Sequence, residues 1–424
     1  MAIEPTQFVT GQNFALTLDK QDPLAHFRDE FIFPKKQNNE PYIYLCGNSL
    51  GLQPKKVKSY IEQELSDWSK YGVLGHLRAK NPWYSYHELL TKNLSHIVGA
   101  KGHEVVVMNT LSVNLHLMMV SFYQPTATRN KIIIEGGAFP SDQYAVQSQI
   151  KFHGFDPKSS LIEVKPKDGE STLTENDFLE TIEKHGNETA LVLIGNVNYL
   201  TGQAFSIKSL TEKAHSKGCK IGFDLAHGAG NLQLRLHDDG PDFAVWCSYK
   251  YLNGGPGSLG GVFVHERHSK DFTLPRFAGW WGHNKVTRFE MSDQFEPMIG
   301  AEGWQLSNPP IFQLAALKAS LEIFEEASMN EITAKSNLMT GYLEFLVSRC
   351  PDIEIITPKN RGAQLSLRFK NQTNTAGMEK KLEELGIIVD FRNPNIIRAA
   401  PAPLYCKFLD IYRFWEAIDE HAKK

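Results

Sequence analysis

Short apolar runs alternate with segments of helical periodicity between residues 104 and 264, and this alternation constrains the fold more than any other feature. The runs are rich in Val, Ile, Leu and Phe, which is typical of strands buried on both faces. Strands that alternate with helices form a parallel sheet with helices packed on its faces. We therefore expect an α/β protein with strands at residues 104–108, 131–135, 161–164, 190–194, 220–224, 243–247 and 262–264, and with helices at 143–150, 175–185 and 207–217.

The pattern changes near residue 311, where a long apolar helix is expected over residues 311–324. Helices at 331–348, 377–385 and 409–421 then mix with strands at 353–356, 364–369 and 387–390, as in a compact α+β unit. Residues 1–40 are polar with scattered aromatic side chains, and we expect an arm or short helix there. The sequence thus predicts an arm at 1–40, a large domain at 41–310 and a small C-terminal domain at 311–424.

Composition and charge favour small-molecule chemistry. The 424 residues carry a net charge of -3 without a basic stripe, which argues against binding to nucleic acid or to an anionic membrane surface. No apolar run approaches the roughly 18 residues of a spanning helix, and the N-terminus does not resemble a secretory signal. The five cysteines are scattered without a CxxC pair, which argues against disulfides and a zinc site and fits the cytoplasm.

Three side chains follow core strands where the carboxyl ends of a parallel sheet would form a crevice: Phe139, Asp224 and Lys250. Each has an ordinary interpretation, and Lys250 alone is best read as a solvated turn residue. Together they predict a site for pyridoxal phosphate, which needs a lysine for its aldehyde, a carboxylate for its ring nitrogen and a stacking face. The helix expected to begin near Thr110 and Ser112 would receive the phosphate.

Two loops have alternative interpretations. Asn48 and Ser49 lie between two glycines, in either a simple tight turn or a ligand-facing loop. His76 lies in a loop rich in large side chains, which often line pockets, although a single histidine is more often structural.

Several long motifs are specific enough to be compared with known families. They are Gly-Asn-Ser-Leu-Gly at 47–51, residues 109–116, Phe-Pro-Ser-Asp at 139–142, Gly-Phe-Asp-Leu-Ala-His at 222–227, Trp-Cys-Ser-Tyr-Lys-Tyr-Leu-Asn at 246–253, Gly-Trp-Trp-Gly-His at 279–283 and Ser-Asn-Pro-Pro at 307–310. Together they resemble the kynureninase family of pyridoxal-phosphate enzymes, which have the aspartate-aminotransferase fold (fold type I). The resemblance covers nearly the whole chain. It implies a mostly parallel seven-stranded sheet with helices on both faces, a small domain assembled from both chain ends, and a homodimer with active sites at its interface.

The resemblance also assigns roles to individual residues. It implies that Lys250 forms the Schiff base with the cofactor, that Asp224 holds the pyridine nitrogen and that Tyr249 contacts the phosphate. The full set of implied cofactor contacts is Leu111, Ser112, Phe139, Ser141, Asp142, Asp224, His227, Tyr249, Lys250, Trp280 and Asn308, with Trp280 and Asn308 reaching the site from the partner subunit. The implied substrate contacts are Asn48, Ser49, His76, Ser307, Asn308 and Arg398, of which Arg398 would bind the α-carboxylate.

The implied reaction is hydrolysis of the Cβ–Cγ bond of kynurenine or 3-hydroxykynurenine to alanine and an anthranilate, within tryptophan catabolism or NAD biosynthesis. Lys250 would move the Cα proton, and Tyr249 would serve as acid and base in later proton transfers. His76, Ser307 and Asn308 resemble the residues that contact the aromatic amine side in forms preferring the hydroxylated substrate.

Three alternatives remain at this point. A cysteine desulfurase or selenocysteine lyase shares the fold but needs a mobile catalytic cysteine, for which Cys350 or Cys406 would have to serve. An aminotransferase is a weaker rival. A catalytically silent ligand-binding relative is a third, although the combination of lysine, aspartate, arginine and tyrosine argues against it.

Overall fold

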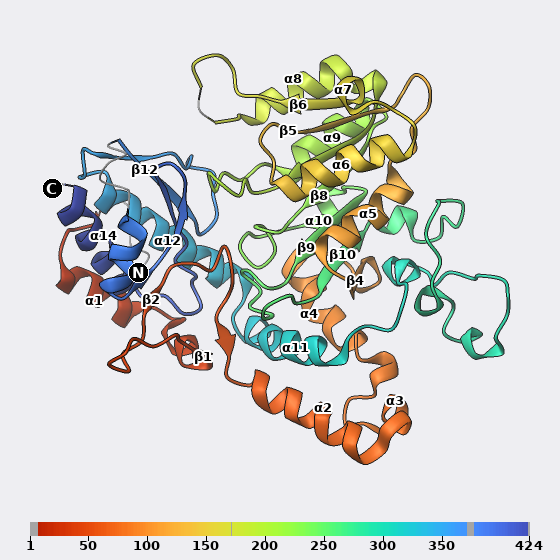
Figure 1. Ribbon diagram of the computed structural model, residues 1–424, viewed down its shortest axis with the longest axis horizontal. Helices are drawn as coiled ribbons and strands as arrows, with labels where there is room; N and C mark the ends of the chain where they lie inside the picture. Colours follow the sequence, from red (N-terminus) through yellow and green to blue (C-terminus); the bar gives the residue numbers. More distant parts are fainter. Residues whose placement is uncertain (1–6, 171, 371–376, 423–424) are drawn as a thin grey trace.

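The computed structural model describes residues 7–170, 172–370 and 377–422, so the first six residues of the expected arm lie outside the described residues. It has two lobes (Figure 1): a large lobe built on a seven-stranded sheet, and a smaller lobe at the left of the view that contains both chain ends. Helix α1 (Gln12–Gln21) of the arm packs there against the C-terminal helix α14 (Phe408–Ala422).

The large sheet has the strand order β4-β10-β9-β8-β7-β5-β6. Neighbouring strands from β6 to β9 are parallel, and only β10 runs antiparallel to its two neighbours, β9 and β4. The expected mostly parallel sheet of seven strands is therefore confirmed. Its strands are β4 (Val105–Met108), β5 (Lys131–Glu135), β6 (Leu161–Val164), β7 (Thr189–Gly195), β8 (Lys220–Asp224), β9 (Phe243–Cys247) and β10 (Gly260–Val264).

Helices cover both faces of this sheet because successive strand residues point to opposite sides. In β5, Ile132 and Ile134 face one apolar core and Ile133 faces the other. One core contains side chains of α5 (Leu111–Phe122) and α6 (Pro140–Phe152). The other contains side chains of α4 (Glu88–Val98), α8 (Glu175–His185), α9 (Ile207–Ser216) and α11 (Ile311–Glu326).

Local sequence signals set the helix ends. Helix α8 begins with a capping box, in which the Thr174 hydroxyl accepts a hydrogen bond from the backbone N–H of Asp177 and the Asp177 carboxylate accepts one from the backbone N–H of Thr174. Helix α6 starts three residues before the expected 143, because Pro140 suits the first helical position. The remaining short helices are α3 (Gly75–Arg78), α7 (Pro157–Ser160) and α10 (Leu236–Asp239).

The small C-terminal domain has its own antiparallel sheet of order β11-β12-β15-β14. The expected single strand at 387–390 is wrong, because the structure divides it between two sheets. β13 (Ile387–Ile388) pairs with β2 (Ile43–Tyr44) from the N-terminal part of the chain. The other elements are β11 (Ile353–Ile355), β12 (Leu365–Phe369), β14 (Asp390–Arg392), β15 (Ile396–Ala399), α12 (Met329–Val347) and α13 (Met378–Glu384).

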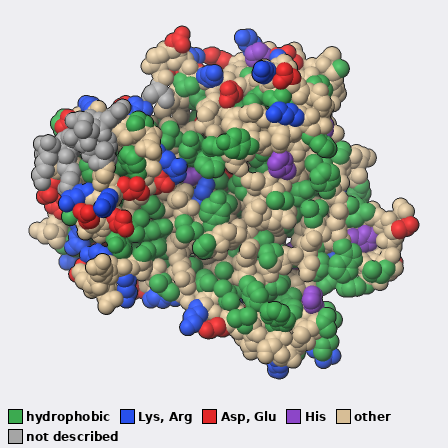
Figure 2. All heavy atoms as spheres, viewed as in Figure 1, with side chains coloured by type: hydrophobic (Ala, Val, Ile, Leu, Met, Phe, Trp, Pro, Cys, Tyr) green, Lys and Arg blue, Asp and Glu red, His purple; other side chains and the backbone are tan. Residues whose placement is uncertain are grey.

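Helix α11 joins the two lobes and packs against α4 and against α2 (Val57–Tyr71), which follows the small β1 (Phe31–Ile32) and β3 (Gln53–Pro54) pair. Apolar side chains cover much of the middle of the face in Figure 2. Exposed apolar residues also occur on α2 and α3 and in the segment that follows β10, among them Trp68, Leu77, Trp280, Val286 and Phe289. None of the helices in the described ranges is long and apolar enough to cross a membrane.

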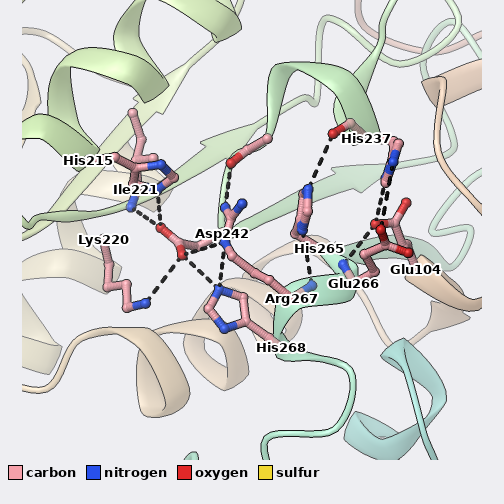
Figure 3. A network of polar contacts seen from close by, with 11 residues as sticks. Glu104, His215, Lys220, Ile221, His237, Asp242, His265, Glu266, Arg267 and His268 are labelled. Carbon is pink, nitrogen blue, oxygen red and sulfur yellow. Dashed lines mark hydrogen bonds and ion pairs between the residues drawn. The ribbon is translucent and has the colours of Figure 1, made fainter.

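A buried carboxylate fixes the amino-terminal end of β9 (Figure 3). Asp242 accepts a hydrogen bond from the backbone N–H of Ile221, at 2.9 Å, and lies 3.0 Å from His215 Nε2 and 2.7 Å from His268 Nε2. Lys220 adds an ion pair at 3.4 Å. These contacts join β8, α9 and the turn after β10 at one point, at the end of β9 opposite Lys250.

Candidate functional site

A cavity opens at the carboxyl ends of β5, β7 and β8 and at the amino ends of α5 and α6, where open α/β sheets bind ligands. It brings together the three residues expected to share a crevice, Phe139, Asp224 and Lys250. Of the expected cofactor contacts only Trp280 and Asn308 do not line it. Its lining is Thr110, Leu111, Ser112, Ile134, Glu135, Ala138, Phe139, Ser141, Asp142, Gly195, Val197, Tyr199, Asp224, Ala226, His227, Tyr249 and Lys250.

Lys250 lies in the turn after β9, with its Nζ 3.0 Å from His227 Nε2. Burial lowers the pKa of His227 well below its usual value, and the positive charges of Lys250 and Arg398 lower it further. The ring is therefore neutral near pH 7 and can accept a hydrogen bond from Nζ. Its Nδ1 is buried and has no partner among the described residues. The Lys250 amine is thus held in place by Nε2 of the neutral His227 ring, while the Nδ1–H group of the same ring is left without a partner among the described residues.

Asp224 ends β8 and shares a hydrogen bond with Asp142 of α6. Burial raises the pKa of both carboxyls, and the nearby negative charge of Asp224 raises that of Asp142 well above its usual range. For Asp224 the rise is opposed by the charge of Lys250, by the backbone N–H of Ala226 at 2.6 Å and by Asp142. Of the two carboxyls, Asp142 therefore holds a proton more tightly than Asp224.

Phe139 precedes α6 and remains 46% exposed, so its ring is available to a ligand. Lys250 Nζ lies 6.0 Å from the ring centroid, and Tyr199 packs edge-on against the ring at 5.2 Å between centroids. Tyr249 lies beside Lys250, and burial raises the pKa of its hydroxyl well above the usual value, with its hydrogen bond to Cys247 as a further cause. The hydroxyl is therefore protonated at neutral pH.

Two helix amino ends meet at the same cavity. Neither Thr110, which precedes α5, nor Phe139, which precedes α6, caps its helix with a side chain. The expected hydroxyl cap by Thr110 or Ser112 is therefore not formed, and the Ser112 hydroxyl lies 2.8 Å from that of Ser141 instead. Uncapped N–H groups, the positive ends of two helix dipoles and two hydroxyls suit an anion such as a phosphate.

Arg398 lies on β15 and is 2% exposed. Its Nε donates to Asp390 Oδ1 at 2.9 Å, and its remaining nitrogens pair with Asp390 Oδ2 at 2.8 Å and donate to the backbone carbonyl of Tyr199 at 2.6 Å. Because Tyr199 lines the cavity, this contact brings an arginine of the small domain to its edge.

The turn around Asn48 and Ser49 packs against the Lys250 loop. The backbone N–H of Gly51 donates to the carbonyl of Tyr249 at 2.8 Å, and a Cβ at Gly51 would lie only 2.4 Å from the carbonyl oxygen of Lys250. This close approach explains the second glycine of the motif. Asn48 is buried and donates to the side chain of Gln364, whereas Ser49 is exposed.

The structure does not bring His76, Trp280, Ser307 or Asn308 to the cavity of their own chain. His76 lies on α3, where its Nδ1 is 3.1 Å from the carbonyl of Val73, and α3 lies at the far end of α2 in Figure 1. Trp280 is 48% exposed, and Ser307 and Asn308 are exposed as well.

Sequence reasoning missed Glu135, Asn198, Tyr199 and Asp390. Glu135 could have been found, because it ends an apolar strand in the same way as Asp224. Burial raises its pKa to about 7, and a hydrogen bond from Asn198 opposes the rise. Asn198 and Tyr199 follow the strand expected at 190–194, and Asp390 ends the one expected at 387–390, but these positions did not reveal which residues they contact.

The cysteines required by the rival desulfurase reaction are both buried and do not line the cavity. Cys406 donates to the carbonyl of Tyr44, and burial raises its thiol pKa to about 12. Cys350 lies 3.2 Å from Asp419 Oδ1. Both thiols are buried, whereas a reactive cysteine is partly exposed.

Comparison with known proteins gives one family and one fold. Residues 332–418 match the family model of the kynureninase C-terminal domain. The chain is 60% identical to a kynureninase of Myxococcus xanthus, with 99% of each protein covered, and 56% identical to one of Koribacter versatilis, with 96% of this chain and 97% of the relative covered. It is 47% identical to a kynureninase of Nematostella vectensis, with 98% of this chain and 97% of the relative covered.

Solved structures with the same fold are more distant in sequence. The cysteine desulfurase CsdA of Escherichia coli superposes with a TM-score of 0.76 at 17% identity, over 94% of this chain and 98% of that one. A cysteine desulfurase of Thermococcus onnurineus gives 0.74 at 18% identity, with both chains fully covered. Another neighbour, with a TM-score of 0.76 at 15% identity over 93% of this chain and 99% of that one, carries glycine covalently linked to its pyridoxal-phosphate cofactor. At these identities the likeness establishes the fold alone.

Proposed function

Because the chain belongs to the kynureninase family, we propose that it hydrolyses the Cβ–Cγ bond of L-kynurenine, 3-hydroxy-L-kynurenine or both. The products are L-alanine and anthranilate or 3-hydroxyanthranilate, which places the enzyme in tryptophan catabolism and, with the hydroxylated substrate, in NAD synthesis. One observation carries the proposal: Lys250 Nζ lies 3.0 Å from a buried neutral His227, in a cavity that also contains the exposed ring of Phe139 and the buried Asp224.

The cofactor is pyridoxal 5'-phosphate, and the chain's own residues fit it. Buried polar atoms that lack partners among the described residues, Asp142 Oδ1 and His227 Nδ1, lie in the cavity wall. Phe139 offers a free ring face, and the uncapped ends of α5 and α6 offer N–H donors for a phosphate. When bound, the cofactor supplies an aldehyde for a Schiff base and a ring that accepts electrons from the substrate.

Each cavity residue has a proposed role toward this group. Lys250 provides the amine for the Schiff base, and His227 holds that amine in position. Asp224 keeps a proton on the pyridine nitrogen, and Asp142 holds the Asp224 carboxylate in position. Phe139 covers one ring face. The phosphate is bound by the N-terminal N–H groups of α5 and α6, by the hydroxyls of Ser112 and Ser141 and by Tyr249, with Leu111 alongside.

The proposed proton transfers use Lys250 and Tyr249. Once the substrate amine has released it, Lys250 Nζ takes the proton from the substrate Cα. Its neighbour His227 accepts a hydrogen bond and does not compete for the proton, because its own pKa is low. Water adds to the γ-carbonyl, and the Cβ–Cγ bond breaks as the carboxylic acid forms. Tyr249, which is protonated at neutral pH, supplies the proton that Cβ gains.

Substrate recognition in this proposal combines residues from two subunits. Arg398, oriented by Asp390, binds the α-carboxylate, and the turn of Asn48 and Ser49 lies next to the Lys250 loop. His76, Trp280, Ser307 and Asn308 act on the cavity of the partner subunit in a homodimer. Exposed apolar side chains around these positions support the homodimer, including Leu77 on α3 and Val286 and Phe289 after Trp280.

The proposed domain boundaries are 1–40, 41–310 and 311–424, with the arm belonging to the small domain. Contacts between α1 and α14 and between β2 and β13 support the role of the arm region, although α11 also packs on α2 and α4 of the large domain. We place the protein in the cytoplasm, and its five buried cysteines, none of which forms a disulfide in the described structure, support a reducing compartment.

The test is product analysis with two substrates. The purified protein loaded with pyridoxal phosphate is incubated with kynurenine, with 3-hydroxykynurenine and with cysteine. Release of alanine with an anthranilate is expected, and the ratio of kcat/KM for the two kynurenines gives the preference. Sulfide release from cysteine without turnover of either kynurenine would overturn the proposal in favour of the desulfurase alternative. Cofactor binding without any turnover would favour the silent relative.

A further inference from the structure

Glu135 is a buried carboxyl group to which the proposed reaction gives no role. It is the last residue of β5, is 3% exposed and lines the cavity. None of the ion pairs found among the described residues involves it, and its side-chain hydrogen bond comes from Asn198 Nδ2, at 2.7 Å. A carboxyl group buried without a cation is costly, so its presence in the cavity wall calls for an explanation.

Asn198 holds together the turn that follows β7. Its Oδ1 accepts hydrogen bonds from the backbone N–H groups of Leu200, at 2.9 Å, and Thr201, at 2.7 Å. Its backbone carbonyl accepts from the N–H of Gly202 at 2.9 Å, and its own N–H donates to the carbonyl of Gln203 at 2.8 Å. The side-chain amide therefore points its oxygen into the turn and its nitrogen at Glu135, which attaches the turn to the sheet.

This turn presents Tyr199 to two parts of the site. The Tyr199 ring packs edge-on against Phe139, at 78° and 5.2 Å. The Tyr199 carbonyl accepts hydrogen bonds from Arg398, at 2.6 Å, and from Gln364 Nε2, at 3.2 Å. A displacement of the turn would consequently disturb the ring that covers the cofactor and the arginine that binds the substrate.

We propose that Glu135 is a positioning residue for substrate binding, which acts through Asn198 and the turn of residues 198–203 to set the place of Tyr199 and Arg398. The proposal rests on the proposed function, because it takes Arg398 as the carboxylate-binding group. Glu135 touches neither Arg398 nor Phe139 in the hydrogen bonds and ring contacts given above, so its influence passes through the turn. A glutamine has the same shape and keeps an acceptor for Asn198 Nδ2, so it should replace Glu135 in this role.

Backbone hydrogen exchange of the holoenzyme tests the first step without reference to activity. In Glu135→Ala the amides of Leu200, Thr201 and Gly202 should exchange roughly tenfold faster, as expected when one buried hydrogen bond is lost. In Glu135→Gln they should stay within about twofold of the unmutated protein. Glu163→Ala is the matched control, because Glu163 accepts an amide hydrogen bond from Gln143 at 2.8 Å on the neighbouring strand but outside the cavity.

Steady-state kinetics test the second step. Glu135→Ala should raise KM for kynurenine about tenfold with a smaller change in kcat, Glu135→Gln should restore KM, and Glu163→Ala should leave both constants unchanged. Unchanged exchange or unchanged KM in a folded Glu135→Ala protein would overturn the proposal. If Glu135→Ala does not fold, Asn198→Asp removes the same hydrogen bond from the other side while it keeps the Oδ1 acceptor for the N–H groups of Leu200 and Thr201, and it is judged by the same results. Failure of the unmutated protein to cleave kynurenine would contradict the proposed function instead, while exchange would still report on the turn.

Discussion

The replacement Asp242→Asn tests how much the polar network at the start of β9 contributes to stability. Asp242 is 1% exposed, and its carboxylate contacts the backbone N–H of Ile221, the rings of His215 and His268, and Lys220. Asparagine keeps the size but loses the charge, and it turns an NH₂ group toward these donors. Removing one partner of a buried charge network costs about 3–5 kcal/mol. We expect about 3 kcal/mol at pH 7, because His215 and Lys220 are partly exposed and can rehydrate.

The sign of the pH dependence follows from the pKa of Asp242. Burial opposes its ionisation, but the hydrogen bonds from His215 and His268 and the charge of Lys220 outweigh burial, so the pKa lies well below its usual value. Because the pKa of Asp242 is lower in the folded than in the unfolded protein, its ionised carboxylate stabilises the folded state at any pH above the unfolded-state pKa. This stabilisation is lost as the pH falls toward the folded-state pKa. The free energy of unfolding of the unmutated protein should therefore exceed that of Asp242→Asn by the full amount above about pH 5. This difference should shrink by about 1.4 kcal/mol for each pH unit below about 3.9.

The assay is equilibrium unfolding in urea, followed by tryptophan fluorescence and far-UV circular dichroism, from pH 7 down to the lowest pH at which the unmutated protein folds. Glu266→Gln is the control, because Glu266 belongs to the polar cluster of Figure 3 but is an exposed partner of Lys101. Its unfolding should match that of the unmutated protein. Equal stability of Asp242→Asn and the unmutated protein at pH 7, or an advantage that grows toward low pH, would refute the reasoning.

Three further predictions concern the cavity. Lys250→Ala should lower kcat for kynurenine by at least about 10²–10⁴-fold, measured by anthranilate release, because the amine that moves the Cα proton is gone. Phe139→Ala should weaken binding of pyridoxal phosphate to the cofactor-free protein by up to about tenfold, measured by absorbance titration, because a stacking face is lost. Burial raises the pKa of Glu135 to about 7, so ionisation of Glu135 destabilises the folded protein as the pH rises through 7. The melting temperature of cofactor-free Glu135→Gln should therefore exceed that of the unmutated protein by an amount that grows between pH 5 and pH 8. Below about pH 4 the two melting temperatures should not differ in this way.

Local patterns predicted the elements that depend on neighbouring residues alone. The bounds expected for β5, β6, β9 and α8 are those observed, because uniform apolar runs and a capping box act within a few residues. The order of strands and helices along the chain was enough to place Phe139, Asp224 and Lys250 at one edge of the sheet, because parallel strands bring their carboxyl ends together.

Contacts between segments far apart in the sequence decided the strand directions, the strand pairing and the side-chain partners that local patterns did not predict. The sequence does not reveal that β10 runs antiparallel, that β13 pairs with β2, or that Asp390 orients Arg398, because each depends on which partner is adjacent after folding. The same is true of Asn198, which meets Glu135 across 63 positions of the chain. The sequence by itself determined the family, the sheet and the position of the reactive lysine, since these follow from motifs and short-range periodicity. Only the tertiary structure decided how the surrounding carboxyls share protons, since burial and proximity in space set their pKa values.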